Sequence, residues 1–208
     1  IGLAVATQPR VLLLDEPLVG LAAQERERII VLIKSLADYM AILLIEHDID
    51  RVFEFSDFVT VMNEAQVLVT GKPDDVRYNE QVQIAYLGSG KDKIIQTQSN
   101  SGRDYDRDAE PRLLELEAIN TYYGKSHILN DVSLDVCKGE IVALLGRNGA
   151  GKSSTLKSIM GIAPVADGRI TFNGREIQHF QPEEISRLGI GLVPQRSEEH
   201  TSELQSPD

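Results

Sequence analysis

Residues 146–153, with the sequence GRNGAGKS, constrain the fold of this chain more than any other stretch because they match the pattern GxxxxGK[S/T]. They follow an apolar run at residues 141–145, typical of a buried parallel strand, and precede a helical stretch at residues 152–160. Glycines let such a loop curl until successive backbone N–H groups point at a phosphate, and the helix N-terminus adds its positive dipole end. The sequence therefore predicts a nucleotide-phosphate site in an α/β domain.

Within this loop, the residue types predict ATP and Mg²⁺ as ligands. The Lys152 ammonium would reach the β- and γ-phosphates, and the Ser153 hydroxyl would ligate Mg²⁺. The residues expected to contact the nucleotide here are Asn148, Gly149, Ala150, Gly151, Lys152, Ser153 and Ser154.

A second chemical signal is a pair of carboxylates, Asp15 and Glu16, directly after the apolar run at residues 11–14. Asp15 suits Mg²⁺ coordination through water, and Glu16 suits a general base that polarises an attacking water. Such a pair can also be a simple helix N-cap. The functional interpretation is favoured by His47, which follows the next buried run, residues 41–45, and could donate to a γ-phosphate.

The pattern of apolar runs and polar stretches divides the chain into four parts. Residues 1–87 alternate strand and helix signals, residues 88–111 are polar enough to form a linker that needs no packing, and residues 112–195 resume the pattern. Residues 166–168 are expected to form a turn. The predicted fold class is α/β, with a mainly parallel core sheet flanked by helices plus an antiparallel β part.

Residues 196–208 break every pattern in the chain. The string RSEEHTSELQS resembles the translation of a common short-read sequencing adapter, so this tail is interpreted as non-native and His200 is not a metal-site candidate.

Composition excludes two broad classes of function. A net charge of −11 disfavours a general nucleic-acid binder, because such affinity rests largely on Lys and Arg neutralising phosphates. The longest apolar runs fall far short of the roughly 18 residues that a membrane-spanning helix needs. The single cysteine, Cys137, cannot form an intrachain disulfide, which fits a reducing cytosol.

Together these motifs resemble the ATPase subunits of ATP-binding cassette (ABC) transporters, which are P-loop NTPases. LLLDEP at residues 12–17 resembles the family's Walker B motif, IEHD at residues 45–48 its switch histidine, and GRNGAGKSS at residues 146–154 its Walker A loop. The resemblance implies that Gln195 is the Q-loop glutamine that senses the γ-phosphate and Mg²⁺, and that Tyr123 stacks on adenine. A core aromatic at a strand end remains the alternative for Tyr123.

The likeness extends to branched-chain amino acid importers. Residues 1–87 resemble the C-terminal part of the first of their two ATPases, and residues 112–195 the N-terminal part of the second. The Walker motifs are in reversed order, and no LSGGQ-like signature is present, so the chain is interpreted as a fragment of a tandem fusion without a complete site. Val19 and Ala22 depart from the Ser and Asp of many relatives. A circularly permuted single domain, with Asp15 and Glu16 folded back beside Lys152, remains an alternative.

The resemblance also implies partners and a location. The expected partners are ATP, a second ABC ATPase domain in a dimer sandwich, transmembrane permease subunits and, indirectly, a periplasmic solute-binding protein; no nucleic acid is expected. The expected location is cytoplasmic, peripheral on the inner face of the cell membrane. A urea or amide importer, a non-transport ABC ATPase and a nucleotide-binding scaffold without catalysis remain alternatives.

Overall fold

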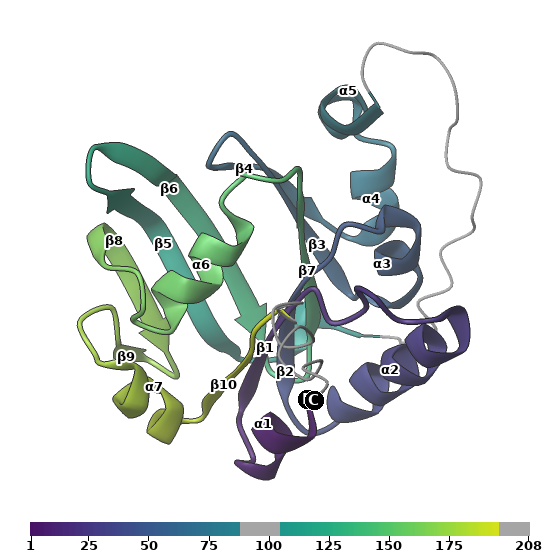
Figure 1. Ribbon diagram of the computed structural model, residues 1–208, viewed down its shortest axis with the longest axis horizontal. Coiled ribbons are helices and arrows are strands. Elements are labelled where there is room, and N and C mark those ends of the chain that lie inside the picture. Colours follow the sequence, from purple (N-terminus) through teal and green to yellow (C-terminus); the bar gives the residue numbers. More distant parts are fainter. Residues whose placement is uncertain (88–104, 196–208) are drawn as a thin grey trace, which may run out of the picture.

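The computed structural model describes residues 1–87 and 105–195, which form two sheets with helices around them (Figure 1). The first segment (residues 1–87) holds α1 Gly2–Ala6, β1 Val11–Asp15, α2 Ala23–Leu36, β2 Ala41–Ile45, α3 Ile49–Phe55, β3 Phe58–Asn63, β4 Gln66–Gly71, α4 Pro73–Arg77 and α5 Glu80–Leu87. The second segment (residues 112–195) holds β5 Arg112–Tyr123, β6 Ser126–Cys137, β7 Ile141–Gly146, α6 Lys152–Ile159, β8 Val165–Phe172, β9 Arg175–Glu176, α7 Pro182–Leu188 and β10 Ile190–Val193. Between the two segments lies a short 3₁₀ helix, η1 Arg107–Ala109.

The main sheet interleaves strands from both segments in the order β10-β1-β2-β7-β3-β4. Neighbours from β10 to β3 pair in parallel, for example Val11 with Ile190 and Ile42 with Ile141, and β4 pairs antiparallel with β3. The first segment thus supplies two strands between β10 and β7, and β7 lies between β2 and β3. This strand order agrees with the alternative of a permuted single domain, in which Asp15 and Glu16 fold back beside Lys152.

Apolar runs explain why the central strands lie in the middle of the sheet. All five residues of β2 and the first four of β1 are buried, and successive side chains enter opposite faces. Leu13 contributes to the core between the two sheets, and Leu12 contributes to the core under α2 and α3. The α/β class with a mainly parallel sheet and an antiparallel part is confirmed.

The second sheet is antiparallel, in the order β6-β5-β8-β9, and one expectation fails in it. Residues 166–168 lie inside β8 rather than forming a turn. Gly168 adopts φ +91° opposite Ala118 at φ +46°, where the register between β5 and β8 shifts. A Cβ at Gly168 would collide with the Ala118 carbonyl, so the glycine serves a bulge between paired strands rather than a chain reversal.

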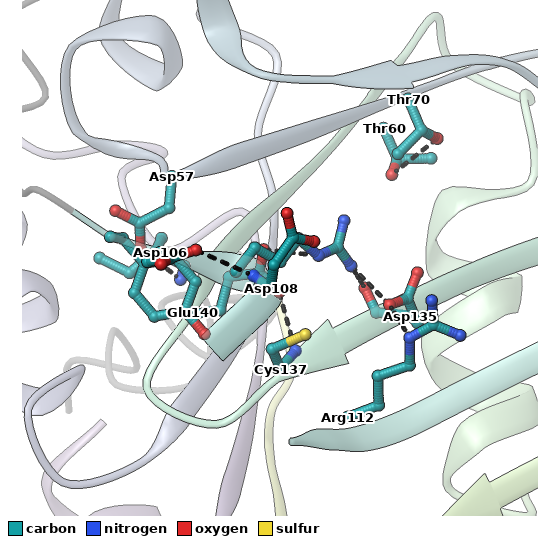
Figure 2. Close-up of polar contacts among 12 residues, drawn as sticks. Asp57, Thr60, Thr70, Asp106, Asp108, Arg112, Asp135, Cys137 and Glu140 are labelled. Carbon is teal, nitrogen blue, oxygen red and sulfur yellow. Dashed lines mark hydrogen bonds and ion pairs between the residues drawn. The ribbon is translucent and has the colours of Figure 1, made fainter. Parts of the chain in front are cut away.

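The end of the expected linker packs against both segments, which corrects the expectation that the linker needs no packing. Its residues 88–104 lie outside the described part of the chain. The Arg107 guanidinium lies 4.0 Å from the centre of the Phe58 ring, its Nη2 lies 2.7 Å from Asp135 Oδ2, and its Nε lies 3.2 Å from Glu140 Oε1. The Tyr105 hydroxyl donates to the Lys138 carbonyl. We call this group, Phe58, Tyr105, Arg107, Asp135 and Glu140, the joint; Figure 2 shows Asp135 and Glu140 within it.

A buried carboxylate makes the joint electrostatically distinctive. Glu140 is fully buried, and its Oε2 accepts a hydrogen bond from the Cys137 amide. Burial raises the pKa of the Glu140 carboxyl to about 7, although the amide and Arg107 both favour its charged form. Its Oε1 is near enough to Arg107 for an ion pair but is not aligned for a hydrogen bond. Asp57, on the first segment and labelled in Figure 2, accepts a hydrogen bond from the Ile141 amide and so adds a side-chain contact between the segments.

Candidate functional site

The phosphate loop connects β7 to α6 and needs its glycines for two separate reasons. Gly149 and Gly151 adopt φ +84° and +101°, a left-handed backbone that residues with side chains rarely adopt. Gly151 also lacks room for a side chain, because an added Cβ would lie 2.8 Å from Leu129 Cδ2 and 3.1 Å from the Ile128 carbonyl oxygen. The loop is therefore shaped by its own backbone and by the β6 strand behind it.

Lys152 is held inside the loop rather than extended into solvent. Its ammonium donates to the carbonyls of Gly146 and Arg147, at 2.8 and 3.2 Å, and the side chain is only 6% exposed. Burial lowers the pKa of this ammonium, while the nearby carboxylates of Glu16 and Asp15 oppose that shift. The loop thus holds a cation that also lines the cleft.

Two carboxylates from the first segment reach this loop at the carboxyl edge of the parallel sheet. Asp15 Oδ1 accepts a hydrogen bond of 3.3 Å from the Ser153 hydroxyl, and Glu16 Oε2 accepts one of 2.7 Å from the Gln195 amide. Burial raises the pKa of the Asp15 carboxyl; the Ser153 hydrogen bond opposes this shift, and the Glu16 charge adds to it. Residues separated by more than a hundred positions in sequence therefore meet because β1 lies between β10 and β2.

His47 follows β2 and lies beside a carboxylate to which the sequence analysis gave no role. Glu46 is 1% exposed, accepts a hydrogen bond of 2.9 Å from the Leu18 amide, and has its Oε2 3.8 Å from His47 Nδ1. Burial raises the pKa of the Glu46 carboxyl, and its two backbone hydrogen bonds oppose that shift. Its place at the end of a buried strand, next to the predicted histidine, was the signal that could have identified it.

Glu16, His47 and the phosphate loop line one cleft of about 950 Å³, a volume within the range of small-ligand sites. The cleft brings together most of the sequence-predicted residues. Its lining comprises Glu16, Val19, His47, Tyr123, Ile128, Gly146, Arg147, Asn148, Gly149, Gly151, Lys152, Ser153, Ser154 and Gln195.

Two predicted residues do not line this cleft. Asp15 lies behind Ser153 and contacts the cleft through that hydroxyl. Ala150 is buried, and its amide donates to the Arg147 carbonyl, so it supports the bend of the loop from within. Ile128 and Val19 line the cleft although no site role was predicted for them. The pairing of β5 with β6 is the signal that could have identified Ile128, because Ile128 lies on β6, which runs back beside Tyr123.

The donor set fits a magnesium nucleotide. A hydroxyl, a carboxylate and an amide, from Ser153, Asp15 and Gln195, offer the oxygen ligands that Mg²⁺ prefers, and they lie beside a loop of backbone N–H groups. The described residues contain no group of three or more His, Cys, Asp or Glu side chains placed to hold a metal ion. A cation here would therefore share its coordination with the hydroxyl, the amide and the phosphates.

Comparison with known proteins shows which sequences this chain resembles. Residues 129–206 match the family described as ABC transporter. Over 208 residues the chain is 28% identical to a ribose import ATP-binding protein, RbsA 3, of Rhizobium meliloti, with 100% of this chain and 39% of that protein aligned. It is 29% identical to a galactose/methyl galactoside import ATP-binding protein, MglA, of Treponema pallidum over 197 residues, which are 94% of this chain and 38% of that protein.

A third relative, a ribose import ATP-binding protein of Rhodococcus jostii, is 30% identical over 201 residues, which are 94% of this chain and 37% of that protein. The chain spans about two fifths of the length of these relatives. Residues 129–206 are thus similar to part of the ABC transporter family. The mainly parallel sheet with helices, together with the antiparallel sheet, confirms the predicted α/β fold class. These three relatives are named for the import of sugars, so the finer likeness to branched-chain amino acid importers stays a prediction.

Proposed function

We propose that this chain is the ATP-binding part of an ABC importer ATPase that couples ATP binding and hydrolysis to solute uptake. The observation that carries the proposal is the single cleft in which the phosphate loop meets Glu16, His47 and Gln195. The three relatives are named as import ATP-binding proteins, which supports the transport role.

In this proposal each cleft residue has a defined task. Lys152 moves from its loop carbonyls to the β- and γ-phosphates, Glu16 orients and polarises the attacking water, and His47 donates to the γ-phosphate. Glu46, whose Oε1 accepts a hydrogen bond from the Leu18 amide, would orient His47, because its Oε2 lies 3.8 Å from His47 Nδ1. Ser153, Gln195 and, through water, Asp15 would hold Mg²⁺, which supplies charge neutralisation between the phosphates.

The proposal also explains the reversed order of motifs. The alignment with a single relative runs through both segments, although it spans only 39% of that relative, which supports the presence of both motif sets, in this order, within one longer chain. We propose that residues 1–87 end one ATPase domain and residues 112–195 begin the next, with the linker between them. Because both domains follow one plan, the first segment can supply the strands that the second segment lacks.

The proposed partners would supply the LSGGQ-like signature, which the sequence of this chain does not contain. An LSGGQ-like signature from a second ABC ATPase domain would close over the nucleotide, and permease subunits would receive the motion, with a periplasmic solute-binding protein acting indirectly. With these partners, we propose a location in the cytoplasm, peripheral on the inner face of the membrane. No helix in the described ranges, 1–87 and 105–195, has the length and apolar character needed to span a bilayer.

For the solute, we propose two candidates that rest on different observations. The motif-level resemblance favours branched-chain amino acids, and the names of the relatives favour a sugar such as ribose or galactose. Uptake of labelled leucine and labelled ribose by cells that carry or lack the gene would separate them, since only one should depend on it. A nucleic-acid role is disfavoured by the net charge of −11.

Binding and turnover of ATP by the purified chain test the proposal. We expect the chain to bind MgATP weakly through the phosphate loop and to hydrolyse it negligibly, since the signature partner is needed for turnover. Calorimetric titration of wild type and Lys152→Ala measures the first expectation, and phosphate release measures the second. Steady hydrolysis that Lys152→Ala abolishes would overturn the second expectation, and failure to bind any nucleotide would overturn the function itself.

A further inference from the structure

The hairpin formed by β5 and β6 carries one wall of the cleft. Its strands pair Tyr123 with Ser126 and Tyr122 with His127, and the turn between them is formed by Gly124 and Lys125. Tyr123 and, on the returning strand, Ile128 line the cleft. Tyr123 is 46% exposed, so its ring depends for its direction on the conformation of the hairpin tip rather than on a surrounding core.

The inner end of this hairpin is fixed by the protein core. Leu129 is fully buried and lies where a side chain on Gly151 would collide with it. The Asn130 amide donates 2.8 Å to the Ala65 carbonyl, in the turn between β3 and β4. The part of the hairpin that supports the phosphate loop is therefore anchored independently of the tip.

The tip of the hairpin is held by the stacked rings of Tyr122 and His127, which lie on the face of the strands opposite Tyr123. Successive strand residues point to opposite faces, so Tyr122 and Tyr123 diverge. The Tyr122 and His127 rings lie parallel, with centroids 4.3 Å apart and planes 11° apart. His127 Nε2 lies 2.8 Å from Asn120 Oδ1, which connects the stack to a residue that is only 8% exposed.

Hydrogen bonds around Asn120 fix the direction of this contact. The Asn120 amide nitrogen donates to Asp131 Oδ1 at 2.8 Å and to the Ala118 carbonyl at 3.0 Å. Its Oδ1 therefore faces His127, and the His127 Nε2 carries the hydrogen that is shared between them. The stacked pair is thus continuous with a polar network that crosses from β5 to β6.

We propose that Tyr122 and His127 are positioning residues for recognition of the nucleotide base: their stack holds the hairpin tip so that Tyr123 presents its ring to the base in the cleft. The inference rests on the proposed nucleotide site and adds to it a pair that lies outside the cleft. Because the phosphate-loop end of the hairpin is anchored by Leu129 and Asn130, loss of the stack should affect the base and spare the phosphates.

The test compares two probes, MgATP and magnesium tripolyphosphate, on the full chain. Tyr122→Leu and His127→Ala should each weaken MgATP binding by about two- to tenfold, the range expected for one aromatic pair, and leave tripolyphosphate binding unchanged. Tyr122→Phe keeps the stacked ring and should bind both probes as wild type does. His179→Ala, at an exposed histidine outside the cleft, is the matched control and should change neither affinity.

The outcomes separate this inference from the proposed function. If the variants weaken both probes equally, or neither, the positioning role is overturned. It is also overturned if Tyr122→Phe behaves like Tyr122→Leu, or if the wild type binds the two probes with equal affinity, since the base then has no part in binding. If the wild type binds neither probe, the proposed nucleotide site fails first. Thermal unfolding of each variant establishes that affinities are compared between folded proteins.

Discussion

The joint and the cleft are both places where the two segments meet, but they balance charge in different ways. At the joint, the Arg107 guanidinium faces the carboxylates of Asp135 and Glu140 and lies over Phe58. At the cleft, Asp15 and Glu16 accept hydrogen bonds from neutral side chains. The joint compensates its charges within the protein and holds the segments together. The cleft keeps two carboxylates and a lysine in reach of a ligand that brings charge of its own.

The largest effect is expected at the joint. Arg107→Ala should lower the free energy of unfolding by about 2–3 kcal/mol, because it leaves a buried carboxylate without its cation. Chemical denaturation measures this change. Arg112→Ala is the matched control: Arg112 also lies beside Asp135, at 3.2 Å, but is 64% exposed, so its loss should cost at most about 1 kcal/mol. Equal effects from the two variants would contradict the comparison.

The next effect belongs to the cleft and should appear in affinity rather than stability. Lys152→Ala should weaken MgATP binding about 10- to 100-fold, since charge-assisted hydrogen bonds to phosphate are lost. The free energy of unfolding should change by less than about 1 kcal/mol, because the lysine now donates to loop carbonyls that water can also satisfy. Lys157→Ala, on the exposed side of α6, serves as the control in calorimetry. If Lys152→Ala instead lowers the free energy of unfolding and leaves MgATP affinity unchanged, the roles assigned to the joint and the cleft are reversed.

The pH dependence of stability sharpens the description of the joint. The folded-state pKa of Glu140 is raised to about 7 from an ordinary 4.5, so between these values the folded chain binds more protons at this site than the unfolded chain. Its contribution to stability is therefore complete below pH 4.5 and is lost as pH rises through about 7. Glu140→Gln should remove a slope of up to about 1.4 kcal/mol per pH unit in this window. Parallel stability curves for the two proteins would contradict the shift.

The smallest stability effect is expected for Asp15, the half-buried carboxylate behind the cleft. Asp15→Asn should leave the free energy of unfolding unchanged or raise it by up to about 1 kcal/mol, because burial penalises the charged form, as its raised pKa indicates. The same change should reduce the dependence of ATP affinity on Mg²⁺. Asp38→Asn, at an exposed position, should alter neither property. A loss of stability beyond 2 kcal/mol would show that Asp15 belongs with the joint.

Much of the fold could be predicted from local patterns. The apolar runs at residues 11–14, 41–45 and 141–145 form β1, β2 and β7 with bounds that differ by at most one residue, and the helical stretch at residues 152–160 forms α6.

The long-range features could not be read from such patterns. That β7 lies between β2 and β3 is a property of strand pairing, and apolar runs of similar composition do not specify their neighbours. The packing of Arg107 was missed because a polar stretch looks solvated until the buried partner Glu140 is placed. The loop lysine and the carboxylates could be selected from the sequence because their chemistry is encoded locally. The strand order that brings them together could not be predicted in the same way.

The most direct test of this convergence is a titration of the ¹⁵N-labelled chain with MgATP, followed through backbone amide resonances. We expect the amides of Gly149, Gly151 and Lys152 to shift together with those of Glu16 and His47, along one binding curve with a single dissociation constant. If the loop amides shift while those of Glu16 and His47 stay in place, or if no amide responds, the two segments do not form one nucleotide site and the account is contradicted.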